Sequence, residues 1–224
     1  MDDGGEAGLR ERHDVREERF EHGGWGVELI LPRAADLLID EADYAADERL
    51  PYWADLWPSA RGLARHLLDA ESGDTRPVLE LGCGVALPSL ALRSLGAPVL
   101  ATDWYEDALR FAEANAVRNR LAPLETALLD WRRPPEGLAF ARVVAADVLY
   151  EARNPALLAA LLPCVTRPGA TVLLADPGRI YAPELLERMA AAGWEVEEAD
   201  ERVEPSAPAA MSRVRIHRLR RPAD

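Results

Sequence analysis

From residue 77 onward the chain alternates short apolar segments with amphipathic ones, and this alternation constrains the fold more than any other feature. The apolar segments at 143–146 and 171–175 are continuous, which is typical of parallel strands covered on both faces. Segments such as 106–120 and 182–193 have the length and spacing of helices. This order predicts an α/β fold with a doubly wound, mostly parallel, seven-stranded sheet. Arginines interrupt the last apolar segment, 211–219, which we expect at a sheet edge.

The N-terminal part departs from this pattern. Residues 1–24 are charged and end in Gly23-Gly24, which predicts a flexible or partly ordered arm. Residues 25–39 contain short apolar runs separated by Pro32 and predict a strand pair, or a strand and a turn. Because 224 residues suffice for one sizeable core, we expect a single domain over residues 25–224 behind the arm.

Composition and charge exclude several classes of protein. No apolar run reaches the roughly 18 residues of a membrane span. The formal net charge of −13 disfavours binding to nucleic acid and favours a basic partner. Cys83, Cys164 and the four histidines lack the spacing of a disulfide framework or a metal site. The acidic N-terminus is unlike a secretory signal, so we expect a cytoplasmic protein with no metal and no membrane partner.

A glycine turn after the first predicted strand of the sheet indicates a cofactor site. Residues 78–86 read VLELGCGVA, in which an apolar strand enters a turn with Gly82 and Gly84 that opens a helix. Glu80 suits an amino group and is ill placed beside a pyrophosphate, and Leu87 stands where a dinucleotide fingerprint has its third glycine. Asp103 ends the next strand, where a carboxylate can bond both hydroxyls of a ribose. Together these residues favour an adenosine ligand without phosphates.

Several segments carry a family resemblance. ELGCG, TDW, LLDW and ADVLYE resemble the motifs of class I S-adenosylmethionine-dependent methyltransferases, which have a Rossmann-like fold. The Trp-Pro at 57–58, LDW at 129–131 and Asp-x-x-Tyr at 147–150 are similar to the protein lysine methyltransferases that include the methyltransferase-like 21 group. Asp-Pro-Gly-Arg at 176–179 resembles the branch that modifies the electron transfer flavoprotein β subunit. Ala86 stands where many members have another glycine, which is tolerable if its backbone angles are ordinary.

The resemblance implies S-adenosylmethionine as the cofactor, S-adenosylhomocysteine as its product, and no metal. The implied cofactor-binding residues are Glu80, Gly82 and Gly84 at the methionine end, Asp103 at the ribose, Asp130 and Trp131 at the adenine, Trp57 beside the sulfonium, and Asp147. An aromatic face such as that of Trp57 stabilises a cation by about 0.5–2 kcal/mol. Ordinary core packing is the alternative explanation for the two tryptophans.

The acceptor site is expected where Asp147 closes its strand. A lysine must be neutral to attack a sulfonium, and Asp147 and Tyr150 are the predicted catalytic residues, which would orient the amine and accept or relay its proton. The alternative is that Asp147 caps the following helix. The predicted substrate entrance consists of Tyr52 and Trp53 as aromatic walls and Asp176 and Arg179 at a strand end. Arg179 could pair with a substrate carboxylate or hold the loop of Asp147.

We therefore expect an S-adenosylmethionine-dependent N-methyltransferase whose partner is a protein with an accessible lysine. Two alternatives stay open at this point: a methyltransferase for a small amine or natural product, because one core serves both, and a catalytically silent cofactor-binding protein. The sequence does not determine the acceptor, the number of methyl groups added or the oligomeric state.

Overall fold

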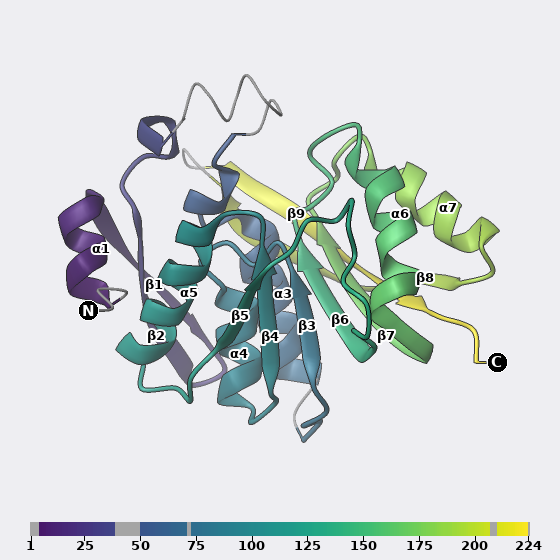
Figure 1. Ribbon diagram of the computed structural model, residues 1–224, viewed down its shortest axis with the longest axis horizontal. Coiled ribbons are helices and arrows are strands. Elements are labelled where there is room, and N and C mark those ends of the chain that lie inside the picture. Colours follow the sequence, from purple (N-terminus) through teal and green to yellow (C-terminus); the bar gives the residue numbers. More distant parts are fainter. Residues whose placement is uncertain (1–4, 39–49, 71–72, 207–209, 224) are drawn as a thin grey trace.

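The computed structural model describes residues 5–38, 50–70, 73–206 and 210–223. Its centre is a seven-stranded sheet in the order β5-β4-β3-β6-β7-β9-β8 (Figure 1). The strands are β3 (Val78–Leu81), β4 (Val99–Asp103), β5 (Glu125–Leu128), β6 (Phe140–Ala146), β7 (Thr166–Asp176), β8 (Glu195–Ser206) and β9 (Ala210–Arg220). Strands β5, β4, β3, β6 and β7 pair in parallel. The predicted fold class is therefore confirmed.

The position predicted for the last strand is wrong. Strand β9 lies between β7 and β8 and pairs antiparallel with both, so β8 is the edge strand. Val214, Ile216 and Leu219 of β9 are fully buried, while its arginines face the acidic residues of β8. Charged side chains such as those of β8 suit an edge, because they discourage pairing with another chain.

Helices cover both faces of the sheet, which explains the continuous apolar strands. They are α3 (Pro58–Ala70), α4 (Leu87–Ser94), α5 (Glu106–Arg118), α6 (Asn154–Val165) and α7 (Ala182–Ala191). Neighbouring residues of β6 belong to different cores: Val144 packs in the cluster that contains Leu90 of α4, and Val143 in the cluster that contains Leu161 of α6. Among the described residues, no helix has the length and apolar character needed to cross a membrane.

Regular elements that pack against the core begin before the boundary predicted at residue 24. A short helix, α1 (Glu6–Arg12), precedes a hairpin of β1 (Val15–His22) and β2 (Trp25–Pro32); residues 1–4 of the predicted arm lie outside the described residues. Gly23 and Gly24 form the two-residue turn with φ of 57° and 81°, as a type I′ hairpin turn requires. Leu9 and Phe20 are buried, which fixes both elements to the core.

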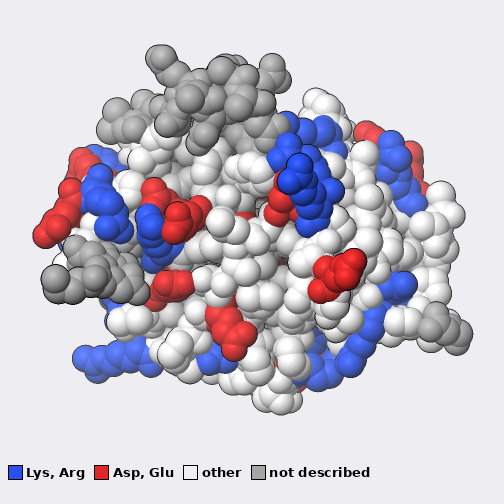
Figure 2. All heavy atoms as spheres, viewed as in Figure 1, with Lys and Arg blue, Asp and Glu red and all other residues white. Residues whose placement is uncertain are grey.

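Ion pairs also hold the N-terminal segment in place. Arg118 of α5 pairs with Glu6 of α1 at 2.7 Å and with Glu17 of β1 at 2.8 Å. Figure 2 shows acidic and arginine side chains interspersed over this face of the molecule. Such exposed pairs contribute about 0–1 kcal/mol each, so the buried contacts of the hairpin matter more.

Asn115 of α5 and Asn119, which directly follows this helix, bind strand β2 of the hairpin. The fully buried Asn115 accepts a hydrogen bond from the Ile30 amide at 2.8 Å and donates to the carbonyl oxygens of Ile30 at 3.1 Å and Val85 at 3.3 Å. One turn later, the half-buried Asn119 repeats this with the amide and carbonyl of Glu28, both at 2.9 Å. The side-chain amides thus pair with backbone groups of β2 that a further strand would otherwise bind.

Replacing Asn115 with Ala is expected to lower the free energy of unfolding by about 2–4 kcal/mol, because it leaves buried backbone groups without partners. The matched control is Asn119→Ala, where water can reach the freed groups and the expected loss is about 1 kcal/mol. Urea unfolding of the two variants measures both values. Equal losses would contradict the role of burial.

Candidate active site

A cleft opens at the carboxyl ends of β3 and β6, where the chain reverses its direction of winding across the sheet. Open α/β sheets bind ligands at such a switch point. The empty space in the cleft is about 970 Å³, including the part open to solvent. Ten of the predicted site residues line it: Tyr52, Trp53, Trp57, Glu80, Gly82, Gly84, Asp103, Trp131, Asp147 and Tyr150.

The glycine turn between β3 and α4 forms the floor of the cleft. Gly82 and Gly84 have φ of 66° and 51°, in the left-handed region. A Cβ atom at Gly84 would lie 3.1 Å from the carbonyl oxygen of Trp53, and one at Gly82 would lie 3.2 Å from Val148. A ligand can therefore approach the backbone of the turn closely only because Gly82 and Gly84 have no side chains. Ala86 also has a positive φ, 66°, so the condition of ordinary backbone angles, under which alanine is tolerable at this position, is not met.

Replacing Gly84 with Ala is expected to lower the free energy of unfolding by about 2–3 kcal/mol, because a left-handed backbone costs about 1–2 kcal/mol and the new methyl group meets a backbone oxygen. Gly137→Ala is the matched control, since Gly137 has φ of 83° but nothing within 4 Å of the added Cβ. We expect the control to lose only about 1 kcal/mol. Thermal or urea unfolding compares the two, and equal losses would show that the close approach to Trp53 is unimportant.

Two carboxylates flank the glycine turn. Glu80 is 1% exposed, and its Oε2 accepts hydrogen bonds from the Ser89 amide, at 3.0 Å, and from the Ser89 hydroxyl. Burial raises the pKa of Glu80 to about 8, and the nearby charge of Asp103 adds to the increase. Asp103 accepts hydrogen bonds from the amides of Gly84, at 2.9 Å, and Tyr105, at 3.1 Å. Asp103 therefore holds the turn and Glu80 holds the start of α4, while both acids line the cleft.

Asp147 lies at the other side of the cleft, directly after β6. Its amide donates to the carbonyl oxygen of Ala175 at 2.9 Å, and its φ of 58° is left-handed, which Asp tolerates better than most residues. The carboxylate is buried, with the whole residue 5% exposed. It accepts hydrogen bonds from Nε of Arg179, at 2.7 Å, and from the hydroxyl of Ser59, at 3.3 Å.

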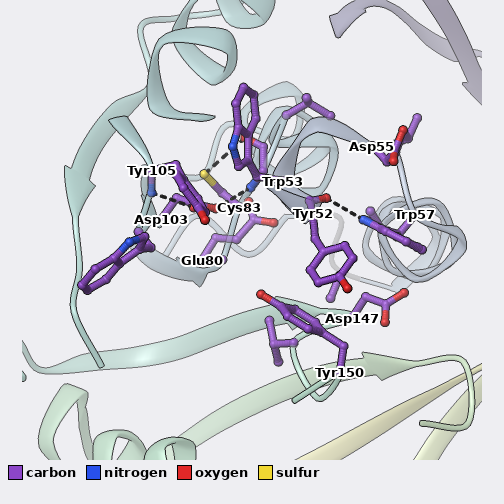
Figure 3. A pocket seen from close by; sticks show the side chains of 18 of the residues that line it. Tyr52, Trp53, Asp55, Trp57, Glu80, Cys83, Asp103, Tyr105, Asp147 and Tyr150 are labelled. Atoms are coloured by element: carbon purple, nitrogen blue, oxygen red, sulfur yellow. Dashed lines mark hydrogen bonds between the residues drawn. The ribbon is translucent and has the colours of Figure 1, made fainter. Parts of the chain in front are cut away.

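Aromatic rings surround Asp147 (Figure 3). The rings of Tyr52 and Tyr150 meet edge to face, with centroids 4.9 Å apart, and Tyr52 also lies against Trp57 at 6.1 Å. Trp57 donates from Nε1 to the Tyr52 carbonyl oxygen at 2.7 Å, which fixes its orientation. Trp53 lies at the opposite side, where its ring packs near Tyr105, so the structure does not bring it to the predicted substrate entrance.

Three predicted site residues do not line the cleft. The Asp130 carboxylate binds the amide of Arg132 at 3.0 Å and its guanidinium at 2.9 Å. Asp176 is buried behind Asp147, and its Oδ1 accepts hydrogen bonds from the amides of Gly178 and Arg179. Arg179 contacts two residues that line the cleft, Asp147 and Trp57, without lining it itself. In the described part of the chain, no three His, Cys, Asp or Glu side chains gather as metal ligands would.

Four further residues bear on the site and were not predicted from the sequence. Trp104 and Tyr105 line the cleft, Ser59 binds Asp147, and Ser89 binds Glu80. Trp104 and Tyr105 directly follow Asp103 at a strand end, so the rule that found Asp103 would also have found them. The two serines carry a weaker signal: each is a polar residue on an otherwise buried helical face.

The sequence matches known proteins over more than half of its length. Residues 51–184 match the family described as lysine methyltransferase. The chain is 37% identical over 132 residues to the electron transfer flavoprotein beta subunit lysine methyltransferase of Danio rerio, a match that covers 58% of this chain and 51% of that protein. The chain thus spans about half the length of this curated relative.

Solved structures with low sequence identity share the fold. The enzyme that converts a disulfide bond into a thioacetal group in echinomycin biosynthesis superposes with a TM-score of 0.62 at 20% identity, covering 84% of this chain and 93% of that one. TYW2 of Pyrococcus horikoshii, in complex with MeSAdo, gives 0.57 at 15% identity, covering 92% and 71%.

Proposed function

Because the chain belongs to the lysine methyltransferase family, we propose that it is an S-adenosylmethionine-dependent N-methyltransferase that acts on a lysine side chain of a protein. The observation that carries this proposal is the division of one cleft into two halves. The glycine turn with Glu80 and Asp103 forms one half, and Asp147 with its aromatic neighbours forms the other. A methyl donor and an amine acceptor can therefore meet between them.

The residues of the first half fit the cofactor. S-adenosylmethionine, when bound, supplies an electrophilic methyl group on a positively charged sulfur. Gly82 and Gly84 leave room that a Cβ would fill, and the Glu80 carboxylate can receive an ammonium group there. Asp103 would hold the ribose hydroxyls, as carboxylates at this strand end commonly do.

The adenine would lie toward β5. Trp131 lines the cleft and offers a ring face that can cover a base. The assignment of Asp130 to the adenine rests on the family resemblance, because its carboxylate binds Arg132 in this structure. We therefore assign the adenine contact to Trp131 first.

The residues of the second half would position the acceptor. The lysine amine would lie between the Asp147 carboxylate and the rings of Tyr52, Trp57 and Tyr150. In this position the nitrogen lone pair would face the methyl group that the bound cofactor supplies. Asp147, directly or through water with Tyr150, would take the proton that the nitrogen gives up.

The charge of the chain supports a basic protein as the partner. A net charge of −13 attracts lysine-bearing proteins over long range. The name of the Danio rerio relative makes the electron transfer flavoprotein β subunit the first candidate to test. We also propose a cytoplasmic location, which the two free cysteines, Cys83 and Cys164, support.

The test is to incubate the purified protein with methyl-labelled S-adenosylmethionine and either the β subunit of the host's electron transfer flavoprotein or a cytosolic extract of the host. Label on a discrete protein band, located on lysine by mass spectrometry, is expected. Because the chain contains no lysine, such label cannot come from automethylation of a lysine. Label found only in the small-molecule fraction would overturn the proposal.

A further inference from the structure

Arg179 contributes a permanent positive charge to the acceptor half of the cleft. It lies in the loop between β7 and α7, and its Nε donates to Oδ1 of Asp147 at 2.7 Å. Its guanidinium carbon lies 5.4 Å from the ring centroid of Trp57. The loop is shaped for this contact, because Asp176 binds the amides of Gly178 and Arg179 at 2.7 and 2.8 Å.

This arrangement resolves a conflict in the proposed chemistry. An isolated buried carboxylate beside a lysine favours the ammonium form, which has no lone pair and cannot attack a methyl group. A carboxylate that is already paired with a guanidinium attracts a second cation much less. The oxygens of Asp147 can then still accept a hydrogen bond from an amine.

We propose that Arg179 is a positioning residue that cancels the charge of Asp147 and keeps the bound acceptor lysine in its neutral, nucleophilic form. This inference rests on the proposed lysine methylation and adds a role that the motif Asp-x-x-Tyr does not include. Arg179 acts through Asp147, since it does not line the cleft itself.

Other charged and titratable groups face this pair from each neighbouring element. Asp176, on the same loop, is buried, which raises its pKa, and Asp147 adds to this increase. Tyr52 comes from the helical turn before α3, and Tyr150 from the segment after β6. Ser59 of α3 donates a hydrogen bond to Asp147 and does not titrate. Arg179 is the cation in contact with the Asp147 carboxylate among the described residues.

The first experiment measures single-turnover methyl transfer to the β subunit of the electron transfer flavoprotein, with enzyme in excess, from pH 6.5 to 9.5. In Arg179→Gln we expect the acidic limb of the pH–rate profile to move up by about one pH unit. The reason is that the pKa of the bound acceptor lysine rises when the positive charge is removed, and a nearby charge shifts a pKa by about 1–3 units. The rate then falls about tenfold at pH 7.5 and recovers near pH 9.5.

Two variants serve as controls. Arg179→Lys should keep the acidic limb of the wild type, and Arg188→Gln removes an exposed arginine of α7. The same loss at every pH would contradict the inference. A variant that is faster than the wild type at pH 7.5 would also contradict it, because Arg179 would then hinder the reaction of the acceptor.

The second experiment needs no turnover. n-Butylamine, which has the stem of a lysine side chain, is titrated against the protein at pH 7, with tryptophan fluorescence as the signal. We expect Arg179→Gln to bind the ammonium form about tenfold more tightly than the wild type, because the negative charge of Asp147 is then no longer compensated by a guanidinium. Equal or weaker binding overturns the inference. If the wild type labels no protein, the proposed function fails, while this comparison still decides the role of Arg179.

Discussion

The variant Asp147→Asn is expected to transfer methyl groups about 10²–10⁴-fold more slowly than the wild type while it still binds the cofactor. The carboxylate is the group that would orient the acceptor amine and take its proton, and an amide cannot accept that proton. Asn is the appropriate replacement because the residue has φ of 58°, a left-handed conformation that Asn adopts at lower cost than Ala. Single-turnover rates and calorimetric titration of the cofactor separate the two effects.

A near-normal rate in Asp147→Asn would remove Asp147 from the mechanism. The double variant with Arg179→Gln adds a second comparison, because the two side chains share one hydrogen bond of 2.7 Å. If Arg179 acts only through Asp147, the double variant is no slower than Asp147→Asn alone. A further loss would show an independent role for Arg179.

The core of the fold could be predicted because burial on both faces leaves a clear trace in the sequence. The continuous apolar run in β6 packs Val143 and Val144 into different cores, and such a run occurs in few other contexts. The first hairpin left a weaker trace. Strand β1 reads VREERFEH, in which Phe20 is the buried residue and the charged residues form ion pairs, so the segment looks like a disordered one. Gly23-Gly24, which ends the predicted arm, is the one signal of a hairpin turn in this segment.

The acids of the site could be predicted from their positions at strand ends. Glu80, Asp103 and Asp147 all follow this rule and all line one cleft. Contacts between loops are only partly predictable in this way. The contact of Arg179 with Asp147 was one of the two alternatives that the sequence left open, and the structure shows this one between residues 32 positions apart in the chain. Tyr52 and Trp53 are neighbours in one helical turn, and small changes in direction send their rings to opposite sides of the cleft.

Cofactor affinity is expected to rise steeply with pH because of Glu80. Without a ligand, burial holds the pKa of Glu80 at about 8, against its ordinary value of 4.5, so the side chain is mostly protonated at neutral pH. An ammonium group bound beside it favours the carboxylate, which lowers this pKa and releases a proton on binding. Affinity therefore increases as pH rises from about 5.5 to 7.5, by up to about tenfold per pH unit, and the gain ends near pH 8. Over this range a free α-amino group, with a pKa of about 7.7–8.0, stays largely charged.

The same shift has the opposite effect on the stability of the ligand-free protein. Between about pH 4.5 and 8 the folded state keeps a proton at Glu80 that the unfolded chain has lost. The contribution of this group to the free energy of unfolding therefore falls as pH rises through that range.

The variant Glu80→Gln tests the effect on cofactor affinity, because Gln mimics the protonated form and keeps an oxygen for Ser89. Its cofactor affinity should resemble that of the wild type at pH 5.5 and remain unchanged at pH 7.5, where the wild type binds more tightly. Titration calorimetry in two buffers of different ionisation enthalpy measures the released proton directly, and a wild-type affinity that does not change with pH would show that Glu80 does not receive the ammonium group.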